Sequence, residues 1–192
     1  MRKLKLQVQL SLDGFMCGPA GELDWMIWDW DDRLNEYVRE LTEPVDHILL
    51  GRNLAEGFIP HWQNAAEETG ADMDTKKMAE RRKTVFSYRL DPGDDLIKTW
   101  RNTNVERGDL KKTISKLKQA PGGDLIAYGG AEFVTNLIEN KLIDEYHLFY
   151  NPVSIGVGKS IFNDLSSPLK LKLTNSNSFD CGIVVNTYIN KL

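Results

Sequence analysis

The stretch DLIAYGGAEFVTNLIENKLIDEYHL, residues 124–148, carries the pattern that decides the fold. An apolar run from Leu125 to Tyr128 is followed by the pair Gly129 and Gly130. Apolar residues then recur at helical spacing, at positions 133, 134, 137 and 138, and an alternating segment follows at positions 143–150. This order predicts a strand, a glycine turn, a helix and a second strand that returns to the same sheet, which is a βαβ unit.

The glycine pair lies where the strand turns into the helix. Without Cβ atoms at these positions, backbone N–H groups are accessible at the positive end of the helix dipole. Such an environment suits the phosphate of a ligand. Glycine turns also serve only to redirect the chain in many α/β proteins, so the pair by itself leaves both interpretations open.

Outside this unit, predicted strands and helices alternate along the chain. Strands are expected at residues 4–10, 47–51, 83–87 and 99–105, and helices at 30–41, from 52, at about 74–81 and from 110 after a cap at Asp109. The segment between Pro60 and Arg82 is otherwise expected to be irregular. Two alternating runs between Leu169 and Ile189, separated by SFDCG, indicate a hairpin. The sequence therefore predicts one α/β domain over residues 1–192, with a mostly parallel sheet that ends in antiparallel strands.

Composition narrows the function classes. A net charge of −4 and the absence of a long Lys/Arg run argue against a nucleic-acid partner. No apolar stretch approaches the ~20 residues that span a bilayer, and the N-terminus alternates like a strand rather than a signal peptide. We therefore expect a cytoplasmic protein without a membrane segment. The two cysteines and three histidines lack metal-ligand spacing, so no metal is expected.

The sequence contains none of the common nucleotide-binding or nucleophile motifs. The chain has no G-x-G-x-x-G, and GVGKS at residues 156–160 resembles a P-loop only superficially, because Val153 stands at the position of the first glycine. No serine or cysteine occurs in the context of a nucleophile elbow. Hydride transfer needs no protein nucleophile, only a bound cofactor, a pocket that excludes water and a source of protons.

Four stretches together resemble a known family. They are QLSLDGFMCGPAGELDW (9–25), DHILLGRNLAEGF (46–58), KTVFS (83–87) and LIAYGGAEFVTNLIENKLIDEYHLFYNPV (125–153). In this order they are similar to the dihydrofolate reductase-like superfamily, and most to stand-alone proteins that share the reductase domain of the bifunctional riboflavin-biosynthesis deaminase/reductase. The resemblance implies a three-layer α/β sandwich with a mixed central sheet of about eight strands, and NADPH bound across the strand ends.

The resemblance also implies roles for individual residues. Gly129 and Gly130 would form a tight turn, in some members through a cis peptide, and the N–H groups that follow would face the cofactor pyrophosphate. Arg52 would reach the 2′-phosphate, with the Ser87 hydroxyl nearby, and Trp25 would lie near the nicotinamide. The cofactor-binding residues expected on this basis are Gly51, Arg52, Asn53, Ser87, Gly129, Gly130, Ala131, Glu132 and Phe133.

This chain departs from its relatives at several positions. Leu54 replaces a threonine on the phosphate side, while Ala127 and Leu23 replace a glutamate and a serine that contact substrate in the riboflavin-pathway reductase. Dihydrofolate reductases place a carboxylate early in the first helix, against the pterin. Asp31, or alternatively Asp29, is the candidate here, and together with Trp25 it is our expected catalytic group. The alternative is that these acids only cap the helix.

Three functions remain open. The first is an NADPH-dependent reductase of a small planar nitrogen heterocycle or a related conjugated C=N or C=O compound. The second is the riboflavin-pathway enzyme itself, 5-amino-6-(5-phosphoribosylamino)uracil reductase. The third is a non-catalytic NADPH-binding sensor. Because relatives commonly dimerise, and the segment 145–150 and the C-terminal hairpin present aromatic and apolar residues on both faces, we also expect a homodimer.

Overall fold

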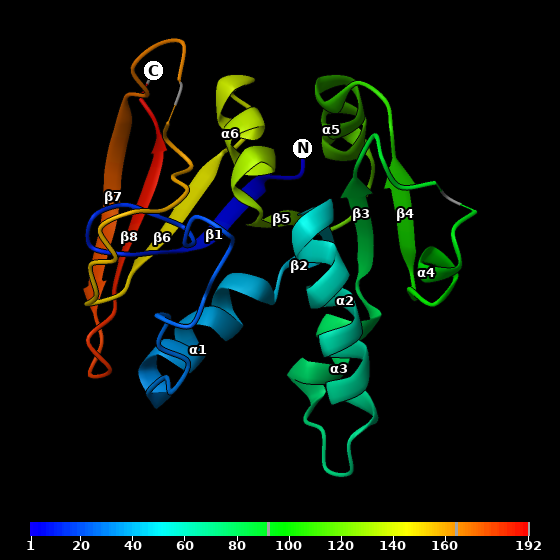
Figure 1. Ribbon diagram of the computed structural model, residues 1–192, viewed down its shortest axis with the longest axis horizontal. Coiled ribbons are helices and arrows are strands. Elements are labelled where there is room, and N and C mark those ends of the chain that lie inside the picture. Colours follow the sequence, from blue (N-terminus) through cyan, green and yellow to red (C-terminus); the bar gives the residue numbers. More distant parts are fainter. Residues whose placement is uncertain (92, 164, 192) are drawn as a thin grey trace.

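The computed structural model describes residues 1–91, 93–163 and 165–191. Its elements centre on one eight-stranded sheet with the order β4-β3-β2-β5-β1-β6-β8-β7 (Figure 1). The strands are β1 Leu4–Leu10, β2 Val45–Gly51, β3 Arg82–Phe86, β4 Thr103–Glu106, β5 Asp124–Gly129, β6 Glu145–Tyr150, β7 Leu171–Ser178 and β8 Val184–Asn190. The helices are α1 Asp32–Thr42, α2 Arg52–Glu67, α3 Met73–Glu80, α4 Asp95–Lys98, α5 Leu110–Gln119 and α6 Ala131–Glu139.

The sheet is mixed, as predicted. Strands β1 to β6 pair in parallel, whereas β6 pairs with β8, and β8 with β7, in antiparallel fashion. The predicted βαβ unit is confirmed as β5-α6-β6. Its two strands are not neighbours, because β1 lies between them and pairs with both.

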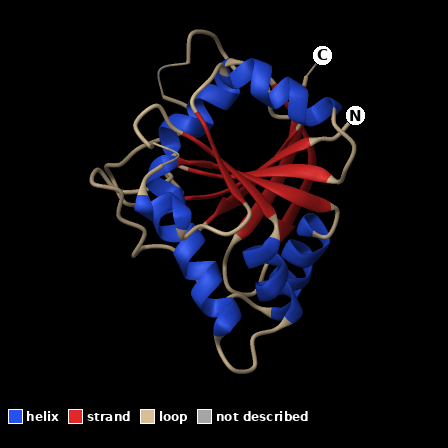
Figure 2. Ribbon diagram, turned by 90° about the vertical axis from the view of Figure 1, so that its right-hand side faces the viewer, coloured by secondary structure: helices blue, strands red, loops and turns tan. Residues whose placement is uncertain are grey.

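Helices cover both faces of the sheet, which gives the three-layer architecture (Figure 2). Side chains alternate along β2, so Leu49 joins one core cluster while Ile48 and Leu50 join the other. The first cluster includes residues of α5 and α6, and the second includes residues of α1, α2 and α3. The predicted sandwich is therefore confirmed, with the carboxyl ends of the parallel strands along one edge.

The prediction of irregular structure directly after Pro60 is wrong. Helix α2 continues through Pro60 as far as Glu67. Its second half is held by tertiary contacts that local sequence does not reveal: Gln63 hydrogen-bonds to Thr99 and Arg101, and Glu67 forms an ion pair with Arg101. Packing thus outweighs the helix-breaking tendency of proline.

Two other boundaries differ from expectation. The expected strand at 99–105 is shorter, because β4 begins only at Thr103. Trp100 is buried directly after α4, and Asn102 adopts a positive φ of 50°, which turns the chain before the strand starts. Helix α1 begins at Asp32, so Trp30 precedes the helix and packs near Phe149 of β6.

Candidate functional site

Two helices begin side by side at the carboxyl ends of β2 and β5. Leu50 of β2 pairs with Gly129 of β5, so the next residue of each strand opens a helix at the same edge. The approach is close: a Cβ built on Gly51 would lie 2.8 Å from Phe133 Cβ and 3.6 Å from Gly130 N. The two predicted phosphate-binding turns are therefore brought together.

These two helix starts differ from those of α1, α3 and α5. Helices α1, α3 and α5 are each capped by an aspartate whose side chain accepts a backbone N–H, namely Asp31, Asp72 and Asp109. Helices α2 and α6 begin at Gly51 and Gly130, and the described residues supply no side-chain cap to either. Their first N–H groups have no partner within the helix, so both helix starts can bind an anion.

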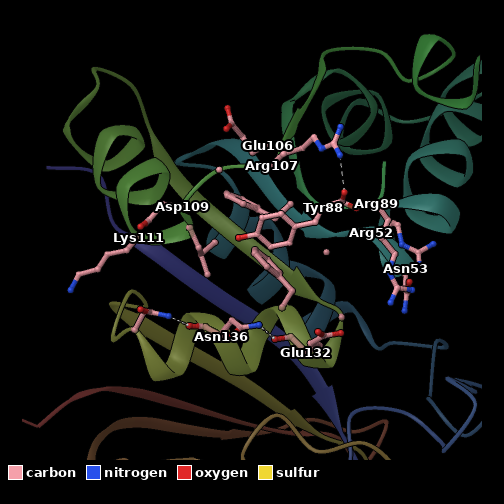
Figure 3. A pocket seen from close by; sticks show the side chains of 18 of the residues that line it. Arg52, Asn53, Tyr88, Arg89, Glu106, Arg107, Asp109, Lys111, Glu132 and Asn136 are labelled. Atoms are coloured by element: carbon pink, nitrogen blue, oxygen red, sulfur yellow. Dashed lines mark hydrogen bonds between the residues drawn. The ribbon is translucent and has the colours of Figure 1, made fainter. Parts of the chain in front are cut away.

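A cavity of about 920 Å³ opens at this place, along the carboxyl ends of β5, β2, β3 and β4 (Figure 3). Its volume falls within the range of small-molecule and cofactor sites, about 300–1,000 Å³. Eight of the nine residues predicted to bind cofactor line it: Gly51, Arg52, Asn53, Ser87, Gly130, Ala131, Glu132 and Phe133.

The two glycines of the turn have different surroundings. The peptide bond between Gly129 and Gly130 is cis, which agrees with the tight turn expected there. Gly129 has a φ of +148°, and a Cβ there would collide with Met16, so this position needs glycine for the turn itself. Gly130 has a φ of −53°, and a Cβ there would meet no described atom within 4 Å. Gly130 thus leaves space in the cavity, whereas Gly129 shapes the turn.

Arg52 and Ser87 can both donate hydrogen bonds at this site. The Arg52 guanidinium is half-buried, and its Nη1 lies 2.8 Å from Glu56 Oε1, one helical turn further along α2. The Ser87 Oγ accepts hydrogen bonds from the N–H groups of Arg89 and Leu90, each at 3.1 Å. Since the oxygen is the acceptor in both bonds, the Ser87 hydroxyl hydrogen is left to donate to a ligand.

Other cavity residues were missed by the sequence analysis. They come from the loops after β3 and β4 and from the start of α5, and include Tyr88, Arg89, Arg107 and Lys111. The pairing of Phe86 with Gly51 and with Glu106 brings these loops to the same edge. Parallel strands collect binding residues at their carboxyl ends, but only the order of the strands in the sheet shows that these loops lie beside the two helix starts. The cavity wall carries four cations and three acids, a balance of +1 in a chain whose net charge is −4.

The two predicted catalytic residues lie outside this cavity wall. Asp31 caps α1: its Oδ1 accepts the N–H of Leu34 at 2.9 Å, and its Oδ2 accepts that of Cys181 at 3.0 Å. These bonds, that of Cys181 foremost, lower the pKa of Asp31 below its usual value. The Trp25 indole Nε1 is buried and has no hydrogen-bond partner among the described residues. A catalytic role for either residue stays a prediction.

The described part of the chain contains neither a cluster of metal-ligating side chains nor a helix suited to cross a membrane. Residues 1–91, 93–163 and 165–191 hold no group of three or more His, Cys, Asp or Glu side chains arranged to bind a metal ion. Across the same residues, no helix combines the length and the apolar character that a bilayer requires.

Comparison with known proteins agrees with this geometry. The family model of the RibD C-terminal domain matches residues 2–185. The chain belongs to the RibD C-terminal domain family. A curated relative is the uncharacterized protein YyaP of Bacillus subtilis (strain 168), which is 33% identical over 190 residues, covering 97% of this chain and 94% of YyaP.

Solved structures of similar fold include two informative neighbours. One is a putative riboflavin biosynthesis protein from Shewanella sp. PV-4, with a TM-score of 0.73, 21% identity and full coverage of both chains. Another is the dihydrofolate reductase from Enterococcus faecalis in complex with NADP(H), with a TM-score of 0.63, 13% identity and coverage of 99% of this chain and 97% of that one. The dihydrofolate reductase-like fold is thus confirmed. Family and fold together support a reductase of the riboflavin-pathway and dihydrofolate reductase type.

Proposed function

We propose that this protein is an NADPH-dependent reductase of a small planar nitrogen heterocycle or a related conjugated C=N or C=O compound. The observation that carries the proposal is the pair of uncapped helix starts, Gly51 and Gly130, which open on one cavity. Two helix starts side by side suit the two phosphates of a dinucleotide better than a single anion. Gly130 contributes further, because its missing side chain lets the backbone approach a phosphate.

The residues present fit this cofactor. The N–H groups at the starts of α2 and α6 would hold the diphosphate, and Arg52 with Ser87 would hold the 2′-phosphate. When bound, NADPH supplies the hydride for the reduction. For this cofactor the Arg52 guanidinium would exchange its partner Glu56 for a phosphate group of higher charge.

Asp31 suits the orientation of a substrate better than proton donation. Its lowered pKa keeps the carboxyl group ionised at neutral pH, so it can accept a hydrogen bond but holds no proton to give. If it reaches the substrate, it would bind a ring N–H of a heterocycle. The proton for the reduction would then come from water.

The second candidate is 5-amino-6-(5-phosphoribosylamino)uracil reductase. Family membership favours it. Two residues count against this substrate: Ala127, which is fully buried in the core, and Leu23, which offers no hydrogen bond where the relatives have a serine. The third candidate, a non-catalytic NADPH sensor, shares the cofactor site and differs only in lacking turnover.

A substrate screen tests the proposal. The purified protein is incubated with NADPH and a panel of pterins, flavin precursors, the riboflavin-pathway pyrimidine and small carbonyl compounds, and the absorbance of NADPH is followed. We expect oxidation with at least one planar heterocycle or conjugated carbonyl compound, and slower oxidation by the Gly130→Val variant at a limiting NADPH concentration. Turnover of the pyrimidine alone would favour the second candidate, and NADPH binding without any turnover would favour the sensor.

A further inference from the structure

The loop between β1 and α1, residues 11–31, borders the candidate site on the side away from the cavity. The described residues of the cavity wall all lie between positions 51 and 140, so none of them belongs to this loop. The loop still reaches the glycine turn, because a Cβ built on Gly129 would collide with the end of the Met16 side chain. It also carries Trp25 and Asp31, the two residues predicted to be catalytic. The way in which this loop is held therefore bears on the proposed reaction.

Asn151 is a fully buried polar residue directly after β6. Its backbone N–H donates to the Leu10 carbonyl at 2.8 Å, which continues the pairing of β6 with β1. Its side-chain Nδ2 donates to Gln9 Oε1 at 2.7 Å, and its Oδ1 accepts the backbone N–H of Ile27 at 3.0 Å. Asn151 thus connects the carboxyl ends of two strands with the loop between β1 and α1.

The orientation of the Asn151 amide group follows from its partners. A backbone N–H can only donate, so the atom that faces Ile27 is the amide oxygen. The Nδ2 is then directed at Gln9 Oε1 and lies within 3.5 Å of the carbonyl oxygens of Leu10 and Phe149, which are all acceptors. An amide supplies an acceptor on one side and donors on the other, which neither a leucine nor an ionised aspartate can do.

The loop segment 19–30 has no other hydrogen bond to a distant part of the described chain. Its remaining hydrogen bonds join its members to one another or to residues between Gly18 and Asn35. Among the residues that the structure describes, only the bond from Ile27 to Asn151 crosses from this segment to the sheet. Trp25, two residues before Ile27, therefore depends on Asn151 for the polar attachment of its loop.

We propose that Asn151 is a positioning residue, which holds the segment 19–30 with Trp25 beside the nicotinamide end of the bound cofactor. This inference rests on the proposed function. A diphosphate at the starts of α2 and α6, with the 2′-phosphate on the cavity side, directs the other nucleoside past β5 toward β1. The loop after β1 borders that side, where Met16 meets Gly129. Asn151 itself lies under the loop and acts through it.

Breaking the bond between Asn151 and Ile27 should affect one half of the cofactor more than the other. Without its acceptor, the Ile27 N–H no longer favours the position of the loop against the sheet. A ligand that needs the loop in place then binds more weakly, in proportion to the fraction of molecules that keep it there. A ligand that occupies only the cavity has no such requirement.

Two variants break this bond from opposite sides. Asn151→Leu keeps a side chain of similar size and removes the acceptor, whereas Ile27→Pro removes the donor and leaves the buried asparagine in place. The control is Asn190→Leu, because Asn190 Nδ2 also donates to a backbone carbonyl, that of Ile143 at 2.7 Å, but near the opposite end of β6.

Calorimetry and hydrogen exchange are measured on all four proteins. Reduced nicotinamide mononucleotide carries one half of the cofactor, adenosine 2′,5′-bisphosphate carries the other, and NADPH carries both. Asn151→Leu and Ile27→Pro should weaken the mononucleotide and NADPH by about 5- to 100-fold and leave the bisphosphate unchanged. Exchange of the backbone amides in the segment 19–30 should become faster in both variants. Asn190→Leu should bind all three ligands like the wild type.

The opposite results separate this inference from the proposed function. If both variants bind the mononucleotide like the wild type, or lose the bisphosphate to the same extent, Asn151 has only a structural role, while NADPH binding by the wild type still stands. Unchanged exchange of the segment 19–30 would equally overturn the role of Asn151. A wild type that does not bind NADPH refutes the proposed function, and the inference that rests on it, before any variant is compared.

Discussion

Neither the φ of Gly130 nor the packing around it requires a glycine. Its φ is negative, and a Cβ would meet no described atom. The residue before it, Gly129, is required by its positive φ, and a Cβ there would also displace the tip of the Met16 side chain. A glycine that neither backbone conformation nor packing requires, at the start of an uncapped helix, is accounted for by the close approach of a ligand.

Arg52 is the residue for which we predict cofactor selectivity. Arg52→Ala should weaken NADPH by about 10- to 150-fold, the range of a hydrogen bond to a charged group, and leave NADH almost unchanged. The measurement is a titration of both cofactors followed by tryptophan fluorescence. Arg101→Ala is the matched control, because Arg101 is also ion-paired to α2, through Glu67, but does not line the cavity. Equal losses for NADPH and NADH in Arg52→Ala would mean that the arginine serves only packing.

The helices and strands that could be predicted from the sequence are those determined by residues close to one another along the chain. The alternation of β1, the cap at Asp109 and the strand-glycine-helix order of β5 and α6 are local signals, and the structure reproduces them. The passage of α2 through Pro60 depends on contacts with Thr99 and Arg101, more than thirty residues away, so no local pattern could reveal it.

The same distinction applies to the candidate site. Gly51, Arg52 and Gly130 follow apolar strands directly and could be singled out from sequence. Tyr88 and Arg107 could not, because their nearness to the helix starts follows from the order of β2, β3 and β4 in the sheet. That order becomes visible only when the strands are assembled.

Asp31 connects the start of α1 with the turn between β7 and β8, where Cys181 lies. Substituting Asp31 distinguishes a role in helix capping from a role in substrate binding. Asp31→Ala should lower the melting temperature by several degrees, because the N–H groups of Leu34 and Cys181 lose their acceptor. Asp31→Asn should keep most of this stability, since asparagine also caps helices. Thermal melts and NADPH oxidation are measured on both variants. Asp31→Asn with normal stability and lost turnover would assign the carboxylate to the substrate, and normal turnover would assign it to capping alone.

The ionised carboxylate of Glu145, in β6, should make the free energy of unfolding depend on pH in the acid range. His147 Nε2, 3.7 Å away, and Lys3 Nζ, at 2.6 Å, hold the pKa of the Glu145 carboxyl at about 2. In the unfolded chain the same carboxyl group has a pKa of about 4.3. The ionised group therefore stabilises the fold above that pH, and this stabilisation is lost as the pH falls from about 4 to about 2.

Melting curves of Glu145→Gln across pH check this sign. The variant should melt below the wild type at pH 7, and the difference should shrink as the pH falls toward about 2. Asp95→Asn removes an exposed partner of Lys98 and should change little at any pH. A difference between Glu145→Gln and wild type that does not vary with pH would contradict the assignment.

In the folded molecule, the apolar residues of β6 are buried and so no longer support the expectation of a homodimer. Tyr146 and Phe149 point to opposite faces of β6, and both are fully buried within the single chain. On the hairpin, β7 is the outer strand of the sheet, and its apolar residue Leu173 is half-exposed. An unpaired edge strand with an apolar side chain offers a surface for association.

We propose on this basis that two copies associate through the β7 side of the sheet. Light scattering at micromolar concentration should give twice the chain mass of 21.9 kDa. Leu173→Lys should shift the mass toward a single chain, since a charge would have to be buried in the interface. A wild-type mass near that of one chain would rule the dimer out.

The cavity formed by β2, β5 and their two helices is central to the account. Titration calorimetry with NADPH tests it most directly, with wild type, Gly130→Val and the control Gly57→Val. An added Cβ at Gly57 also meets no described atom within 4 Å, but Gly57 lies outside the cavity wall. The account predicts saturable binding of one NADPH per chain by the wild type and by Gly57→Val. In Gly130→Val the affinity should fall by at least about tenfold, because the branched side chain occupies the place of a phosphate. No binding by the wild type, or equal affinity in Gly130→Val, would contradict it.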